Sequence, residues 1–124
     1  MSSSKRKPIP PVAFAKALRE TAAVARNAWI KDGPLSVYIR KSERMFVLGK
    51  RVHTIDVANV TVRTPGQGLF TLYLHGVECL AATRGSVVYV ENVIDERFRE
   101  FFRRRGYTEC EGGFGTRSFY LERK

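Results

Sequence analysis

The sequence predicts an α/β domain in which helices flank a mixed β-sheet. The stretch 52–106 alternates between apolar strands and amphipathic helices, and parallel strands need such helical crossovers. Shorter β-rich segments precede and follow this stretch, and glycine or proline separates them, as is typical of β-hairpins. A chain of 124 residues is long enough for one domain with its own core.

The first predicted element is an amphipathic helix. Pro10 and Pro11 suit a helix start, because proline tolerates the first turn. Apolar residues then recur roughly every 3.6 residues, which is the helical period. They are Val12, Ala15, Leu18, Ala22, Ala25 and Trp29. We expect the helix to end at residues 29–31, before the turn-forming segment 31–34.

A β-hairpin and a long central strand are predicted next. Residues 35–40 and 45–48 have strand character, and the polar segment 41–44 is expected to join them as a turn. The strand that follows covers 52–62, but its apolar residues do not keep one alternation. A β-bulge at residues 57–59 would explain this shift of phase.

The central strand runs through a glycine-bearing turn into a helix expected over 69–83. The apolar stripe of this helix comprises Leu69, Phe70, Tyr73, Leu74, Val77, Leu80 and Ala81. Gly85 stands where a helix usually ends. The near-continuous apolar run 86–91 predicts a buried strand, parallel to 52–62 because a helix connects the two.

The last elements are a helix and a hairpin. Asp95 is placed to cap a helix over 96–105, which Gly106 ends, and Phe98, Phe101 and Phe102 form its apolar face. Strands are expected at 107–111 and 118–122. We interpret residues 1–8 as a flexible basic tail and 9–124 as a single domain.

Charge is the strongest signal in the composition. The chain has 22 Lys and Arg against 12 Asp and Glu, a net charge of +10. Such an excess favours anionic partners: nucleic acid, an acidic protein surface or a phosphorylated ligand. No recognised nucleic-acid motif accompanies the charge, so non-specific nucleic-acid binding is an alternative function rather than the leading one.

Other classes of protein are not favoured. Cys79, Cys110, His53 and His75 have no zinc-ligand spacing, so no metal is expected and the thiols indicate a reducing cytoplasm. No apolar run reaches the roughly 20 residues of a membrane helix, and no secretory signal is apparent at the N-terminus.

The turn between strand 52–62 and helix 69–83 predicts an anion site made from backbone. Unpaired N–H groups and the positive end of the dipole meet at a helix N-terminus, and Gly66 and Gly68 allow close approach. A dinucleotide-binding fingerprint fits less well, because Thr71 occupies its third glycine position.

Three segments together resemble the GNAT family of acyl-CoA N-acyltransferases, in the compact form of its phage-encoded members. Val60 followed by Gly66-Gln67-Gly68 resembles the family's strand and pyrophosphate-binding turn. The segment VYVEN, ending at Asn92, resembles its next strand. The segment FFRRRGY resembles the end of its last long helix. The resemblance covers residues 52–107 and implies a GNAT-like mixed sheet with this segment as the coenzyme-binding core.

The resemblance implies that acetyl-CoA is the co-substrate and that an unidentified amine is acetylated. Backbone N–H groups near the turn would bind the pyrophosphate, and the pantetheine arm would pair with backbone that the bulge leaves free. The implied coenzyme-binding residues are Val60, Val62, Arg63, Gly66, Gln67, Gly68, Leu69, Phe70, Asn92 and Arg103.

The implied chemistry needs a base for the amine and an acid for the thiolate. Asp56 and Glu91 are the candidate bases, with His53 as an alternative. The family's usual acid is a tyrosine, but Phe102 occupies that position here. Tyr107, Tyr89 or water are the possible substitutes.

Two further departures concern the coenzyme. Pro65 removes one N–H group from the turn, and Phe70 replaces a small residue at the helix start. An alternative function is therefore a weak or inactive acetyltransferase-like protein that binds and modulates a host protein. A homodimer formed through a sheet edge is also left open.

Overall fold

The computed structural model describes residues 11–45, 50–62, 68–111 and 116–122, which form three helices and six strands. The elements in chain order are α1 (Pro11–Ala23), β1 (Asn27–Asp32), β2 (Leu35–Met45), β3 (Arg51–Val62), α2 (Leu69–Arg84), β4 (Val87–Val93), α3 (Glu96–Arg104), β5 (Thr108–Glu111) and β6 (Arg117–Leu121). The tail predicted at 1–8 and most of the strand predicted at 45–48 lie outside the described residues.

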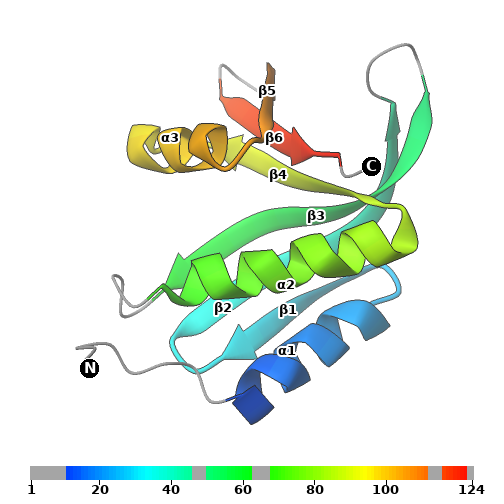
Figure 1. The fold of residues 1–124 in the computed structure, drawn as a ribbon, viewed down its shortest axis with the longest axis vertical. Helices are drawn as coiled ribbons and strands as arrows, with labels where there is room; N and C mark the ends of the chain where they lie inside the picture. The colour runs from blue at the N-terminus through cyan, green and yellow to red at the C-terminus, as the bar shows by residue number, and fades with distance from the viewer. Residues whose placement is uncertain (1–10, 46–49, 63–67, 112–115, 123–124) are drawn as a thin grey trace.

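One mixed sheet contains all six strands, in the order β1-β2-β3-β4-β6-β5. β3 and β4 are parallel, and the other neighbouring pairs are antiparallel. The predicted crossover from β3 through α2 to β4 is therefore confirmed. The crossovers through α2 and α3 advance in the same direction across the sheet, so right-handed connections place both helices on one face. Figure 1 shows α1 on that face too.

The predicted extent of the first helix was wrong. α1 ends at Ala23, and the residues that continued its apolar pattern form β1 instead. Gly33 and Pro34 connect β1 to β2 as a two-residue hairpin turn, with Gly33 at φ 59°. A positive φ at the first central residue is typical of the type II′ turn. Six residue pairs with β2 and burial of Ile30 outweigh the local helical period.

The predicted turn at residues 41–44 was also wrong. β2 is one continuous strand from Leu35 to Met45 and stays paired with β3 throughout. The polar residues of this segment are tolerated in the strand because they form ion pairs. Arg44 pairs with Asp56, and Glu43 lies 3.5 Å from Arg51.

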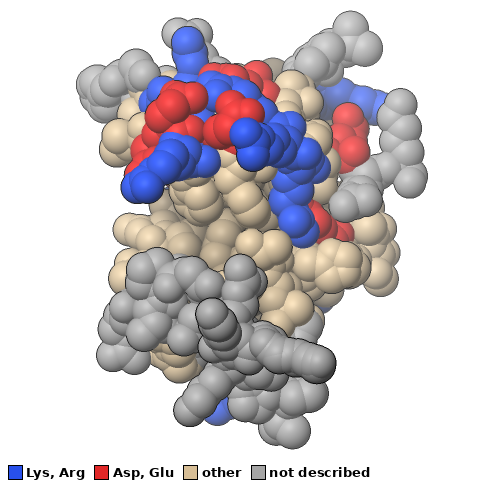
Figure 2. All heavy atoms as spheres, turned by 60° about the vertical axis from the view of Figure 1, so that its left-hand side comes forward, with Lys and Arg blue, Asp and Glu red and all other residues tan. Residues whose placement is uncertain are grey.

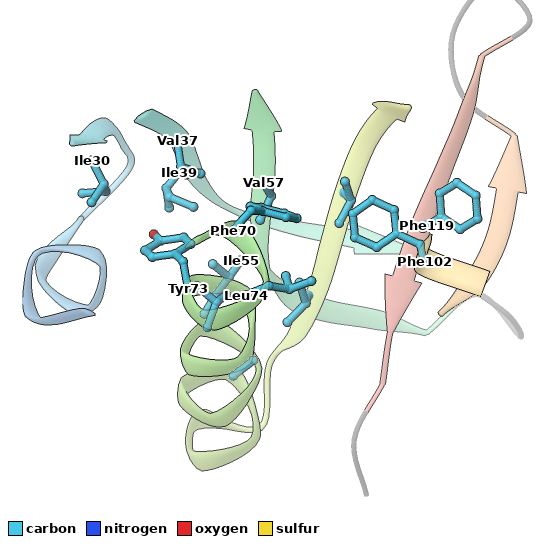
Figure 3. Packing of buried hydrophobic residues seen from close by; sticks show 14 of the residues in the cluster. Ile30, Val37, Ile39, Ile55, Val57, Phe70, Tyr73, Leu74, Phe102 and Phe119 are labelled. Atoms are coloured by element: carbon cyan, nitrogen blue, oxygen red, sulfur yellow. The ribbon is translucent and has the colours of Figure 1, made fainter. Parts of the chain in front are cut away.

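The core lies between the sheet and its helices, as Figure 3 shows. Phe70, Tyr73 and Leu74 of α2 point toward Ile55 and Val57 of β3. The apolar faces predicted for α2 and α3 are confirmed, as are the cap by Asp95 and the C-terminal hairpin. Burial of these side chains is the main term that stabilises the fold.

A buried carboxylate that the sequence pattern did not reveal joins α2 to the end of α3. Glu78 is 2% exposed and accepts two hydrogen bonds from Arg105, at 2.8 and 2.9 Å. The Tyr107 hydroxyl donates a third hydrogen bond at 2.8 Å. Because an unpaired buried charge is strongly destabilising, these three residues hold the end of α3 against α2.

Tyr73 provides a test of the packing between α1 and α2. Its hydroxyl lies 2.5 Å from Thr21 Oγ1, and burial raises its pKa to about 12 while the Thr21 hydrogen bond opposes the rise. The neutral phenol therefore stabilises the fold fully below pH 10, and this contribution is lost as pH rises towards 12. A rise of two pKa units corresponds to about 2.7 kcal/mol of the free energy of unfolding.

We expect the free energy of unfolding of the wild-type protein to fall by about 2 kcal/mol between pH 10 and 12, relative to the Tyr73→Phe variant. Urea denaturation at a series of pH values measures the difference. The variant should be about 1 kcal/mol less stable at pH 7, because Thr21 loses a partner. Parallel pH profiles for the two proteins would contradict the assignment.

Candidate functional site

The parallel strands β3 and β4 separate halfway along their length. They pair over Thr54–Val57 of β3 and Val87–Val90 of β4. Beyond Val57 and Val90, the described residues of the two strands do not pair with each other. On the other side of β3, Tyr38 pairs with Asn59 and Ile39 with Val57, which leaves Ala58 as an extra residue. The β-bulge predicted at residues 57–59 is confirmed, and it lies where the strands part.

β4 is irregular at the same level of the sheet. Its pairing with β6 shifts between Val90 and Val93, and Asn92 has a positive φ of 50°. The Asn92 N–H donates to Ser118 Oγ at 3.0 Å, and Asn92 Oδ1 accepts from Thr116 Oγ1 at 2.8 Å. Asn92 thus fixes the bend that turns β4 away from β3.

The N-terminus of α2 lies at this same end of the sheet (Figure 1). Gly68 is the N-cap residue at φ 71°, with no side chain capping the helix and no acidic residue in its first turn. The first intrahelical bond runs from Leu72 N–H to Gly68 C=O. The first-turn N–H groups of Leu69, Phe70 and Thr71 have no helical acceptor and suit an anion.

Several predicted coenzyme contacts belong to this end of the sheet. Val60 lies on β3 beyond the bulge and is half-buried, whereas the side chains of Leu69 and Phe70 pack into the core. Val62 is the last residue of β3. The predicted contacts Arg63, Gly66 and Gln67, together with Pro65, lie outside the described residues.

Figure 2 shows the molecule turned toward this end. Arginine and glutamate side chains of α3 gather at the top of the view, and an uncharged surface lies below them. The predicted contact Arg103 is held in the charged group, by Glu96, Glu100 and Glu109. Hydrogen bonds to Glu109 and Glu96 raise the pKa of Arg103.

Phe102 is completely buried at the position where the resemblance implies a tyrosine. Its ring contacts several other aromatic rings, with centroids 4.8 to 6.3 Å apart. They are those of Phe70, Phe98, Phe101, Tyr107 and Phe119. Phe102 therefore joins α3 to α2 and β6 by packing.

Asp56 is fully buried on the sheet face opposite the helices. It stands between the core residues Ile55 and Val57, and neighbours in a strand face opposite sides. Its carboxylate accepts from Arg44 Nη2 at 2.9 Å and Arg40 Nε at 3.4 Å. Both arginines belong to β2, so the pairing of β2 with β3 builds this ion-pair cluster.

Glu91 joins the ion-pair cluster from β4. Its Oε2 accepts from Arg44 Nη2 at 3.0 Å and also pairs with Arg40. The Arg44 guanidinium lies 4.0 Å from the ring centroid of Tyr89, a cation–π contact. The fold thus brings the two predicted bases, Asp56 and Glu91, to the same pair of arginines at the point where β3 and β4 part.

The alternative base His53 lies away from this cluster. Its side chain is 76% exposed, and Nδ1 is 3.6 Å from Glu43. The sequence did not predict a role for Arg40 or Arg44, because the polar segment that contains Arg44 is typical of a turn. Their spacing of four residues on one strand would have placed both on the same face.

Within the described residues, no group of three or more His, Cys, Asp and Glu side chains could hold a metal ion. A membrane-crossing helix is likewise absent from those residues, since none is both long and apolar enough.

Comparison by sequence identifies no relative: no protein-family model and no curated protein matches the chain. Comparison of structures does. A tyrosine-to-phenylalanine mutant of the toxin AtaT, bound to the C-terminus of the antitoxin AtaR and acetyl-CoA, aligns with a TM-score of 0.53 at 16% identity. The alignment covers 71% of this chain and 57% of AtaT, so the chain spans little more than half of that protein.

A second similar structure is that of the KacTA–DNA complex. It aligns with a TM-score of 0.56 at 13% identity and covers 93% of this chain and 82% of the other. Identities this low carry information about the fold rather than the activity. Together with the parting of β3 and β4 and the position of α2, these matches show that the chain has a GNAT-like fold.

Proposed function

We propose that this protein binds acyl-CoA between the separated ends of β3 and β4 and transfers the acyl group, an acetyl group in the simplest case, to an amine. The observation that carries the proposal is the coincidence of three features at one end of the sheet. They are the end of β3–β4 pairing at Val57 and Val90, the bulge at Ala58, and the α2 N-terminus, which has no side-chain cap.

Two parts of coenzyme A have a matching feature. The pyrophosphate suits the N–H groups of the first turn of α2, which have no acceptor within the helix and lie at the positive end of its dipole. The pantetheine arm contains amides, and these can pair with backbone of β3 beyond Ala58, where β4 no longer occupies the hydrogen-bonding edge. Such binding uses main chain, so few specific side chains are needed.

The reacting thioester would then lie near the junction of the strands. Glu91 is the base we propose, because its side chain is 17% exposed and, among the described residues, only Oε2 has partners. Asp56 is less suited: it is 0% exposed, and both its oxygens accept hydrogen bonds from Arg40, Arg44 and Thr54.

The proposed reaction forms a carbon–nitrogen bond and breaks the carbon–sulfur bond. Glu91 takes the proton from the attacking amine, directly or through water, and backbone N–H groups stabilise the developing oxyanion. The departing thiolate receives this proton back from Glu91 through water, because Phe102 has none to give and the Tyr107 hydroxyl donates to Glu78. Proximity of the two reactants supplies much of the rate.

A second candidate function is binding of acyl-CoA without transfer, coupled to a partner. The burial of Phe102 favours it, because no acid stands at that position. The AtaT structure contains acetyl-CoA and a segment of the antitoxin AtaR, and KacTA occurs in complex with DNA. Both structures, together with the net charge of +10, favour a protein or nucleic-acid partner for this chain.

Acyl-CoA binding is tested by thermal shift with acetyl-CoA, CoA and ATP. We expect acetyl-CoA and CoA to raise the melting temperature more than ATP does, since a ligand at 100 times its Kd stabilises by about 2.7 kcal/mol. Thr71→Pro removes one N–H group from the first turn of α2, at a position that has no intrahelical hydrogen bond to lose, and should weaken acetyl-CoA binding about tenfold or more. The control Thr71→Ala retains that N–H group. Equal binding of acetyl-CoA by both variants, or no stabilisation of the wild type by acetyl-CoA, would contradict the proposed site.

The role of Glu91 is tested by acetyl transfer to a panel of amines. Glu91→Gln should lower kcat by roughly 10² to 10⁴ while the Kd of acetyl-CoA stays unchanged. Glu43→Gln, on β2 and 44% exposed at its side chain, is the matched control. Unchanged kcat in Glu91→Gln would remove this residue from the mechanism. Acetyl-CoA binding without transfer to any amine would favour the second candidate function.

Phe102→Tyr distinguishes a packing role from a lost catalytic position. The added hydroxyl enters a site closed by aromatic rings, so we expect the variant to be about 1–3 kcal/mol less stable and no more active. Urea denaturation and the acetyl-transfer assay measure the two effects. A variant of wild-type stability with a higher kcat would show that the hydroxyl can reach the reacting thiolate.

A further inference from the structure

A second pocket lies at the opposite end of the sheet from the proposed acyl-CoA site. It is an open pocket with a volume of about 860 Å³, within the range of small-molecule sites. Its lining includes Arg26, Lys41, Ser42, His53, Arg84 and Ser86. Arg84 ends α2 and Ser86 precedes β4, so the pocket adjoins the C-terminus of α2, whereas the proposed acyl-CoA site is at its N-terminus (Figure 1).

Positive side chains dominate this pocket. Arg26, Lys41 and Arg84 line it, and Glu43 is the single carboxylate among its lining residues. Glu43 already lies 3.5 Å from Arg51, which offsets its charge. Among the described residues, no carboxylate forms an ion pair with any of the three cations.

The backbone holds these cations close to one another. Lys41 N–H donates to Arg26 C=O at 2.7 Å, which places the two residues next to each other. Lys41 Nζ and Arg84 Nη2 both donate to the Ala22 carbonyl oxygen near the end of α1, at 2.9 and 3.0 Å. Burial, and next the charge of Arg84, lower the pKa of Lys41.

The C-terminus of α1 does not neutralise the positive charges of Lys41 and Arg84. The C-terminus of α1 carries about half a negative charge, against two full positive charges on Lys41 and Arg84. An ammonium group has three donors and a guanidinium has five, and each side chain uses one of them on Ala22. The remaining donors, with the hydroxyls of Ser42 and Ser86, are available to a ligand in the pocket.

We propose that this pocket binds the phosphate group of a small phosphorylated molecule of up to about nucleotide size. A phosphate has several acceptor oxygens and more than one negative charge, which matches a lysine and two arginines around one space. The pocket volume exceeds that of a phosphate alone, so part of the carrier molecule would enter too. This site is independent of the acyl-CoA proposal and shares no residue with it.

The test is titration of ¹⁵N-labelled full-length protein with inorganic pyrophosphate, followed by amide chemical shifts. Shifts are expected at Lys41, Arg84 and Ser86. The Kd should rise at least tenfold in Lys41→Gln and in Arg84→Gln. Arg84→Lys keeps the charge and should retain most of the affinity. Arg97→Gln is the matched control, because the Arg97 side chain is 95% exposed and lies outside the pocket.

Three outcomes would overturn the proposal. Shifts confined to residues 68–71 would mean that pyrophosphate binds only at the start of α2. Equal weakening by Arg97→Gln would mean that the overall charge attracts it. Binding of a short oligonucleotide without binding of pyrophosphate or a mononucleotide would assign the surface to a nucleic-acid backbone. The amide spectrum of each variant confirms that it is folded, so loss of binding is not confused with unfolding.

Discussion

The short parallel pairing of β3 and β4 is the constraint on which the rest of the structure depends. Only four residues of each strand pair, and α2 must cross the sheet to join them. That crossover places the α2 N-terminus beside the open ends of both strands. The bulge at Ala58 and the bend at Asn92 then direct the strands apart. Backbone hydrogen-bonding groups are normally satisfied within a sheet, so this opening is a natural place for a ligand with amides.

Buried ion pairs connect elements of the fold at two places. Glu78 with Arg105 and Tyr107 joins α2 to the end of α3. Asp56 and Glu91 with Arg40 and Arg44 join three neighbouring strands on the face opposite the helices. Pairing offsets much of the desolvation cost, and removal of one partner would leave a charge without compensation. The same geometry leaves Glu91 more accessible than Asp56, which is why the proposed chemistry uses it.

The two ends of the sheet offer anions two different kinds of contact. At the carboxyl ends of β3 and β4, a helix N-terminus presents backbone N–H groups whose position the fold fixes. At the amino ends of these strands, lysine and arginine side chains converge near the C-terminus of α1. The high net charge is therefore not spread evenly, and three of the four arginines of α3 form ion pairs with glutamates.

The sequence by itself determined the central unit: β3, α2, β4 and α3, with the bulge, the cap by Asp95 and the C-terminal hairpin. These elements have strong periodicity and clear glycine or capping signals, which act locally. Only the tertiary structure decided that Trp29 and Ile30 belong to a strand and not to a helix, because pairing with β2 outweighs helical periodicity. It also decided that the polar residues 41–44 stay in β2, since their partners come from β3 and β4. Pairing between distant residues leaves no local pattern, and for that reason the ion-pair cluster around Asp56 and the pocket at Lys41 emerged only from the fold.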